Sequence, residues 1–437
     1  MRKGYLASMV FAGLTFVWVG GAPAQGLKSF GQGPHPAVPA AELARETVTL
    51  EQLVHEAEEN NPAIGASRHN IDAKRALVLP ARTLPDPTFG FQTMGDLIPP
   101  QLQQGDPSSA RAFSVEQEVP FPGKLSIKGK MAETEATVEE WNHEKTKRDV
   151  IADLKAAYFD FYLVHKSLET VSRDKELLQS FAEIAQEKYR VGQGIQQDVF
   201  KAQVEISKFL EKLTVLEQRR STIAAQINSL LYRNPGTPLG RPAELKRPSL
   251  SYQLEQLNDM AQSGFPELRV KQQEIERNQY AVDLARKNYY PDFTLGFTYF
   301  NRTVPEMFGL GLNVKVPLYF WRKQREELAS ARSSLNSARL VRDNAAAQLY
   351  AKLQENYTMA RSSEKLAGLY QHDLIPQSRL SLESATASYQ VGRADFLKVI
   401  DSLLTLLEYE LKYYEVVTEF HKALARLEPY VGMTLTP

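Results

Sequence analysis

The sequence predicts a mainly α-helical chain with a β-barrel part, built from one unit that occurs twice. Three short motifs return in the same order about 200 residues later. They are Pro85-Asp86-Pro87-Thr88-Phe89-Gly90-Phe91 with Pro291-Asp292-Phe293-Thr294-Leu295-Gly296-Phe297, Val119-Pro120-Phe121 with Val316-Pro317-Leu318, and Tyr189-Arg190-Val191-Gly192 with Tyr389-Gln390-Val391-Gly392. The predicted unit holds two strands followed by two long helices.

The first 48 residues read as export and lead-in segments. Two basic residues precede the apolar run Leu6–Val19, and Ala22-Pro23-Ala24 matches a small-residue cleavage site. A single membrane anchor is the alternative, but the run is short for the ~20 residues that a spanning helix needs. We therefore predict a signal peptide over 1–24 and a flexible lead-in over 25–48.

The composition excludes several classes of protein. Lys plus Arg and Asp plus Glu both number 52, so the formal net charge is zero, which argues against a nucleic-acid partner. There is no cysteine, which excludes disulfides, thiolate metal sites, cysteine nucleophiles and a lipid attached through cysteine. No later stretch is apolar enough to span a bilayer as a helix, so a membrane role has to come from strands.

Each repeat begins with short helices and then two alternating strands. Repeat 1 is predicted over 49–240, where Thr49 and Gln52 form a helix-capping pair, and repeat 2 over 241–437, with a break at Pro266. Apolar and polar residues alternate in four segments, which predicts strands near 87–95, 111–120, 292–300 and 309–318. The alternation alone also fits a half-buried soluble sheet.

A long helical hairpin follows each pair of strands, over 124–232 and 322–428. Apolar residues recur at spacings of four and three along each hairpin, which indicates helices packed against neighbouring helices. The first helix would reach about 100 Å at 1.5 Å per residue, which is typical of a coiled coil. Pro376 predicts a kink in the second copy.

Four strands cannot close a barrel, and an open edge in lipid leaves backbone groups unpaired. Three chains would supply twelve strands, an even number suited to an outer-membrane barrel, together with twelve helical columns that close into a tube. In that arrangement the loops near 96–110 and 301–307 face the cell exterior.

These features resemble the TolC-type outer-membrane efflux proteins across the whole mature chain. The resemblance rests on the duplication, on Pro-Asp before the first strand of each copy, on Val119–Lys124 and on the Tyr-x-x-Gly turns. It implies a homotrimeric channel in the outer membrane of a Gram-negative-type bacterium, without catalysis or cofactor. A periplasmic α-helical barrel would meet a periplasmic adaptor and an inner-membrane pump, in a tripartite efflux or type I secretion-like system. The Val119–Lys124 segment resembles the heavy-metal efflux branch.

The resemblance also assigns candidate residues near the two turns. The adaptor-contact tip would comprise Gly192, Gly194, Asp198, Gly392, Arg393 and Asp395, and the periplasmic gate would involve Asp401, Lys398 and Lys201. Family members close the tip with aspartates six and nine residues after the turn glycine, whereas here Lys398 stands at the nearer place. Lys398 could instead pair with Asp401 or Asp395, the glycines could serve only to end helices, and the charges could form a solvated face.

Two other classes of protein compete with the channel. A periplasmic coiled-coil adaptor would have one hairpin flanked by split β-domains, whereas this chain has two hairpins. A secreted enzyme lacks support because no Ser/His/Asp set, phosphate loop or dinucleotide turn is present. His165 and His421 lie in helical stretches without clustered partners, so we expect packing or surface roles and no metal site.

Overall fold

The computed structural model describes residues 47–95, 102, 104–106, 108–246 and 248–436. The predicted signal peptide, residues 25–46 of the lead-in and part of the first loop lie outside the described residues. Residues 47–48, predicted as flexible, instead form strand β1 (Thr47–Val48), which pairs in parallel with β4 (Arg241–Pro242). The lead-in prediction was wrong at these two residues because their partner lies almost 200 residues away.

The first repeat contains short helices, two strands and a long hairpin. Its elements are α2 (Leu50–Asn60), α3 (Pro62–Ala76), α4 (Val78–Arg82), β2 (Thr88–Met94), β3 (Ala110–Val119), α5 (Lys124–Arg190) and α6 (Gln196–Leu230). Thr49 and Gln52 form the expected capping box of α2. Asn61 caps α3, and Pro62 occupies its first turn, where the missing amide hydrogen costs nothing.

The second repeat has the same order of elements. They are α7 (Leu254–Gly264), α8 (Pro266–Lys287), β5 (Asp292–Arg302), β6 (Met307–Lys315), α9 (Lys323–Leu369), the π-helical segment η1 (Tyr370–Leu374), α10 (Ile375–Gln390) and α11 (Phe396–Val431). β6 ends before the predicted position 318. Pro317 cannot donate to a strand ladder, and the Leu318 amide bonds to the Val316 carbonyl instead.

The interruption expected at Pro376 is present as the π-helical segment that precedes it. Proline lacks an amide hydrogen and its ring crowds the carbonyl one turn earlier, so a regular α-helix is unfavourable there. The helix α5 has 67 residues, and residues 323–390 hold one residue more. A π-turn accommodates one extra residue within a helix, so the two long helices keep matching lengths.

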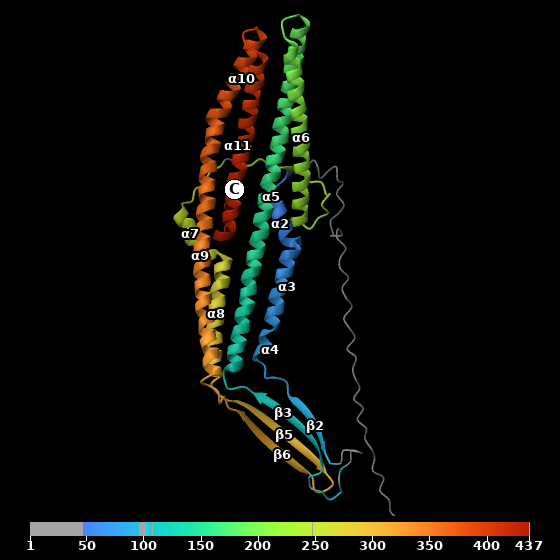
Figure 1. Cartoon of the computed structure of the whole chain (residues 1–437), viewed down its shortest axis with the longest axis vertical. Coiled ribbons are helices and arrows are strands. Elements are labelled where there is room, and N and C mark those ends of the chain that lie inside the picture. Colours follow the sequence, from blue (N-terminus) through green and yellow to red (C-terminus); the bar gives the residue numbers. More distant parts are fainter. Residues whose placement is uncertain (1–46, 96–101, 103, 107, 247, 437) are drawn as a thin grey trace, which may run out of the picture. The chain divides into compact units, whose positions relative to one another are not determined.

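The four long strands form one antiparallel sheet in the order β2-β3-β5-β6. The repeats join at its centre, where β3 pairs with β5 from Val119 opposite Phe293 to Ala110 opposite Arg302. Each repeat thus contributes one inner and one edge strand. Figure 1 shows the sheet at one end of the helices and the α5–α6 and α10–α11 turns at the other.

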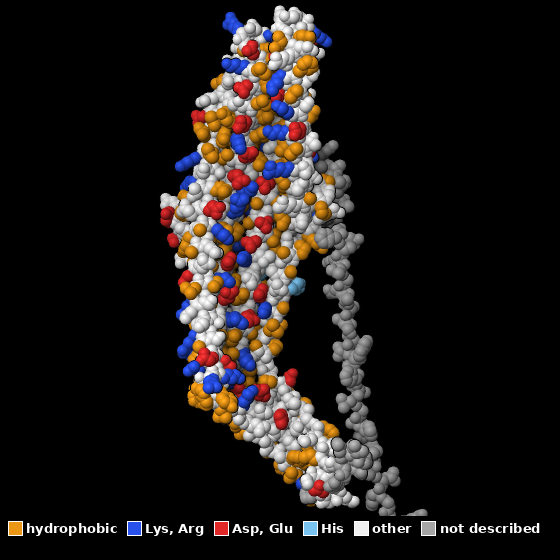
Figure 2. All heavy atoms as spheres, in the orientation of Figure 1, with side chains coloured by type: hydrophobic (Ala, Val, Ile, Leu, Met, Phe, Trp, Pro, Cys, Tyr) orange, Lys and Arg blue, Asp and Glu red, His pale blue; other side chains and the backbone are white. Residues whose placement is uncertain are grey.

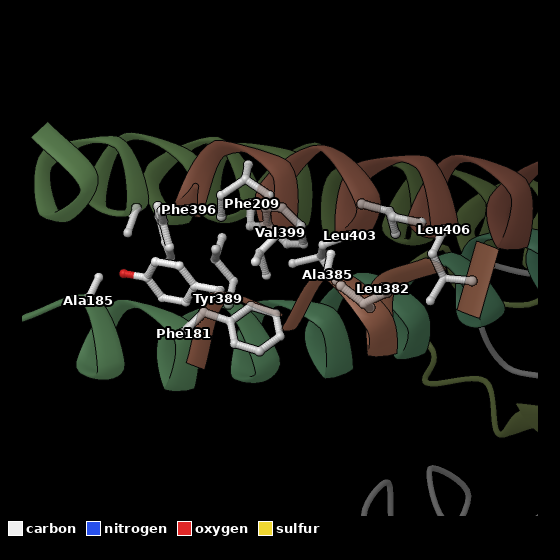
Figure 3. Packing of buried hydrophobic residues seen from close by; sticks show 14 of the residues in the cluster. Phe181, Ala185, Phe209, Leu382, Ala385, Tyr389, Phe396, Val399, Leu403 and Leu406 are labelled. Atoms are coloured by element: carbon white, nitrogen blue, oxygen red, sulfur yellow. The ribbon is translucent and has the colours of Figure 1, made fainter. Parts of the chain in front are cut away.

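The long helices pack side by side along the predicted seams. α5 contacts both α6 and α11, and α11 also contacts α9 and α10. Near the turns, the helices α5, α6, α10 and α11 share one apolar core, shown in Figure 3. Its labelled members are Phe181, Ala185, Phe209, Leu382, Ala385, Tyr389, Phe396, Val399, Leu403 and Leu406. The core joins the two hairpins and sets the relative position of their turns.

Of the helices that the structure describes, none combines the length and the hydropathy needed to cross a bilayer.

Candidate functional site at the paired helical turns

The two helix-to-helix turns have the same backbone geometry. Gly192 and Gly392 have φ of 74° and 73°, in the left-handed region that favours glycine. At the first turn the Gly192 amide donates to the Tyr189 carbonyl at 3.1 Å, and the Gln193 amide donates to the Lys188 carbonyl at 2.8 Å. The second turn repeats both bonds with the same lengths. This pattern ends a helix and reverses the chain.

The surface above both turn glycines is open. A Cβ atom added at either position would meet no other heavy atom within 4 Å. Gly194 differs, because a Cβ there would lie 3.1 Å from the Tyr189 backbone nitrogen. Backbone conformation therefore explains Gly192 and Gly392, and packing explains Gly194.

The structure brings together two of the candidate acids, one from each hairpin. Burial raises the pKa of the Asp198 carboxyl, and the nearby Asp395 carboxylate raises it further. Asp395 and Arg393 are exposed beside the second turn. The tip thus places two acidic side chains, one from each hairpin, close to each other.

The three gate candidates lie on the first two turns of the returning helices. Lys201 binds the buried Glu205 carboxylate at 2.9 Å, so its charge is already partnered. Lys398 and Asp401 are exposed, and within the described part of the chain neither forms an ion pair. Neither of the pairings considered for Lys398, with Asp401 or with Asp395, is therefore present in a single chain.

Lys188 ties the first hairpin to the second and was missed by the sequence analysis. Its ammonium group donates to the Tyr389 carbonyl, donates to the Gln390 carbonyl at 3.2 Å, and lies 4.4 Å from the centre of the Tyr389 ring. These carbonyls belong to the last turn of α10, where a cation is favourable. The tyrosine repeated before each turn glycine was the one sequence feature that pointed to this contact. Only the second of the two is buried, since Tyr389 is 7% exposed and Tyr189 is 45% exposed.

Replacement of Lys188 by Met should loosen the end of α10. A hydrogen bond to a charged group contributes about 1.5–3 kcal/mol, and partial exposure reduces that to about 1–2 kcal/mol here. Amide hydrogen exchange over 386–393 should accelerate roughly 5- to 30-fold. Lys212→Met is the control, since Lys212 is exposed on α6 without an ion pair among the described residues. Equal exchange in both variants would show that the tie is unimportant.

The part of the chain that the structure describes contains no group of three or more His, Asp or Glu side chains placed to hold a metal ion. Burial lowers the pKa of both His165 and His421. His421 lies among the Phe159 and Phe420 rings and shares a hydrogen bond with the Lys246 carbonyl, so it packs in the core.

Two strands followed by a long helical hairpin, repeated once in the chain, define the class of outer-membrane efflux channels. The chain belongs to the outer membrane efflux protein family, whose model matches residues 53–233 and 257–433. The protein is therefore an outer-membrane efflux channel protein, of a family of exit ducts rather than enzymes.

Individual relatives are distant but cover most of the chain. The cobalt-zinc-cadmium resistance protein CzcC of Cupriavidus metallidurans is 20% identical over 396 residues, 88% of this chain and 90% of that protein. The outer-membrane channel OprN has a TM-score of 0.75 at 15% identity, covering 89% of this chain and 91% of its own. CusC has a TM-score of 0.75 at 14% identity, covering 87% and 91%.

Proposed function

We propose that three copies of this chain form a continuous duct from the periplasm to the cell exterior. Their strands would close a twelve-stranded barrel in the outer membrane, and their helices would continue it as a periplasmic tube. Residues 1–24 would direct export, and the repeats over 49–240 and 241–437 would give the trimer a pseudo-sixfold arrangement. The observation that carries this proposal is the four-stranded sheet, which has one exposed apolar face and, among the described residues, two edges without a further strand.

The two faces of the sheet differ sharply in chemistry. In the β2–β3–β5–β6 register, Phe89, Val115, Phe297 and Leu310 form one row across all four strands. The apolar face exposes Phe89, Phe91, Phe113, Val115, Leu295, Phe297, Phe308, Leu310, Leu312 and Val314. The opposite face carries Thr88, Gly90, Ser114, Glu116, Glu118, Thr294, Gly296, Thr298, Gly309, Gly311 and Asn313. Lipid outside and water inside would suit this division.

Charged side chains are also distributed unevenly between the helices and the sheet. In Figure 2, Lys and Arg side chains alternate with Asp and Glu side chains over the helices, and they are sparse over the sheet. A water-exposed tube with mixed charge above a lipid-embedded band matches that distribution.

The open edges of the chain occur on both the sheet and the helices. Within the described residues, the strands β2 and β6 each pair with one other strand of the sheet. Exposed apolar side chains also follow the outer helices, with Phe200, Val204 and Val215 on α6 and Leu340, Leu369 and Leu380 on α9 and α10. If each chain joins one of its edges to the opposite edge of the next chain, a few chains would close into a ring.

The turns would dock onto a periplasmic adaptor that connects the duct to an inner-membrane pump. Val191 and Val391 are exposed beside the turn glycines, and Ile195 and Leu397 are exposed just beyond them. Apolar groups beside open glycines suit close approach of a partner backbone. Gly192, Gly194, Asp198, Gly392, Arg393 and Asp395 would form this contact surface. Similarity to CzcC, named for cobalt, zinc and cadmium resistance, supports divalent metal cations as the substrate.

Reconstitution in planar lipid bilayers tests the proposal. The detergent-solubilised protein should have the mass of a trimer and should form discrete conducting channels. A monomer that stays soluble without detergent would contradict the duct and favour a periplasmic adaptor. Deletion of the gene should raise sensitivity to cobalt, zinc and cadmium; unchanged sensitivity would remove metals from the substrate assignment alone.

The gate would consist of charges that alternate between the two hairpins. Asp198 and Lys398 occupy the same place in α6 and α11, two residues after each helix begins, and Lys201 and Asp401 lie three residues further along. At each of these two positions, one repeat of the chain therefore carries an acid and the other repeat carries a base. In a ring where the hairpins alternate, neighbours would present opposite charges, and their pairing would hold the tip closed. Lys201 would then exchange its bond to Glu205 for one to Asp401, or share its charge between the two carboxylates.

Asp401→Ala should shift the channel towards its open state. An exposed ion pair contributes about 0.2–1 kcal/mol, so three copies contribute about 0.6–3 kcal/mol, or a roughly 3- to 160-fold change in the open-to-closed ratio. Single-channel recording measures this ratio and the cation preference. Glu408→Ala is the control, because Glu408 is exposed on the same helix away from the turn. Identical records from both variants would remove Asp401 from the gate.

A further inference from the structure

A buried ion pair joins the two repeats where the sheet meets the helices. The Lys124 Nζ lies 2.8 and 2.9 Å from the two carboxylate oxygens of Asp292, and the Phe121 amide donates to Asp292 at 2.7 Å. The Phe121 ring stacks on the Tyr290 ring with centres 4.5 Å apart. The Lys124 side chain is only 7% exposed. This joint fixes the end of β3 and the start of α5 to the start of β5.

The internal repeat supplies a second set of the same parts, which a single chain leaves apart. Lys323 begins α9 as Lys124 begins α5, and Asp86 follows a proline before β2 as Asp292 follows a proline at β5. In the described part of the chain, Lys323 and Asp86 are both exposed and form no ion pair. They lie beside the two opposite edges of the sheet.

We infer that Lys323 of one protomer binds Asp86 of the next, so that the joint inside each chain is repeated between chains. This inference rests on the proposed trimeric duct, and it names the contact that closes the ring. The apolar half of the joint has counterparts too: Leu318 takes the place of Phe121 and Leu84 that of Tyr290. Leu318 is 66% exposed and Leu84 43%, so both are available to a neighbour.

The strand register, transferred through the same internal repeat, agrees with this pairing. Gln117 lies opposite Leu295 and Val115 opposite Phe297 in the β3–β5 ladder. In the internal repeat, β6 corresponds to β3 and β2 corresponds to β5. If β6 of one protomer pairs with β2 of the next in the same register, Val314 lies opposite Phe89 and Leu312 lies opposite Phe91. All four are exposed apolar residues. Because a shift of one residue would reverse the faces, the match keeps the apolar faces of adjoining sheets together.

Cysteine crosslinking tests the contact, because the natural chain has no cysteine. The full-length Asp86→Cys/Lys323→Cys variant in detergent micelles is treated with a short bismaleimide and run on a denaturing gel. We expect covalent dimers and trimers, and no larger species than the monomer from either single variant. The control Lys124→Cys/Asp292→Cys should link within one chain and leave the monomer mass unchanged.

Charge reversal gives a second readout. Asp86→Lys should lower the fraction of trimer, and addition of Lys323→Asp should restore it, as measured by light scattering in detergent. If the protein is trimeric but neither crosslinks nor responds to reversal, the Lys323–Asp86 contact is wrong and the duct stands. If the unmodified protein is monomeric in detergent, both the contact and the duct are wrong.

Discussion

Leu312→Arg should prevent stable insertion of the protein into lipid. Leu312 lies in the middle of the exposed apolar run of β6 and is 62% exposed in the single chain. An arginine at the bilayer midplane of a barrel costs about 2–4 kcal/mol, which corresponds to a roughly 30- to 900-fold weaker insertion equilibrium per chain. Urea titration of folding into phospholipid vesicles measures this difference.

Asn313→Arg is the matched control, since it adds the same side chain at the next position. Successive strand residues point to opposite faces, so residue 313 belongs to the polar face with Thr294 and Gly309. We expect that variant to fold into vesicles nearly as well as the unmodified protein. If the two variants lose insertion equally, the assignment of lipid and water to the two faces of the sheet is wrong.

Glu428→Ala should be the most destabilising single change in the helical part. The Lys155 Nζ lies 2.5 Å from one Glu428 oxygen, and both residues are at least 90% buried. The other oxygen accepts bonds from the Leu435 and Thr436 amides at 2.8 Å, so Glu428 also holds the segment that follows α11. Removal of one partner of a buried ion pair leaves the other charge unpaired and costs about 3–5 kcal/mol.

Thermal unfolding of the detergent-solubilised protein measures the loss, as a fall of several degrees in the melting temperature. The control is Glu187→Ala, which removes the exposed pair with Arg190 and should have almost no effect. Lys155→Met/Glu428→Leu removes both charges and should recover most of the stability, because well-packed apolar residues can replace a buried pair. A Glu428→Ala variant as stable as Glu187→Ala would contradict this account.

Much of the fold could be predicted because its local patterns have local causes. Alternation of apolar and polar residues predicted the strands, and the spacing of apolar residues predicted the helical hairpins. Gly192 and Gly392 predicted the turns, where the backbone is left-handed. The end of β6 was placed too late because the pattern continues through Val316 to Leu318, although Pro317 ends the hydrogen bonding. Alternation reports which face a residue occupies and does not report whether its amide is paired.

The candidate site was predicted less completely, since its contacts cross between distant segments. The positions of the charged residues near the turns were visible in the sequence. The Lys188 contact with the end of α10 depends on how the two hairpins lie against each other, which no local pattern specifies. Lys201 remains a predicted gate residue; its ion pair with Glu205, one turn further along the same helix, is a local contact that the sequence analysis did not consider.

The π-helical segment explains how a duplicated chain tolerated unequal copies. A one-residue insertion in a continuous α-helix would rotate everything beyond it by about 100° and displace it by about 1.5 Å. In this chain the extra residue is accommodated within the five residues of η1 (Tyr370–Leu374). Everything downstream, including the Tyr389 side chain and the second turn, keeps its orientation towards the first hairpin. The two halves therefore differ in length by one residue, while their turns keep the same backbone geometry.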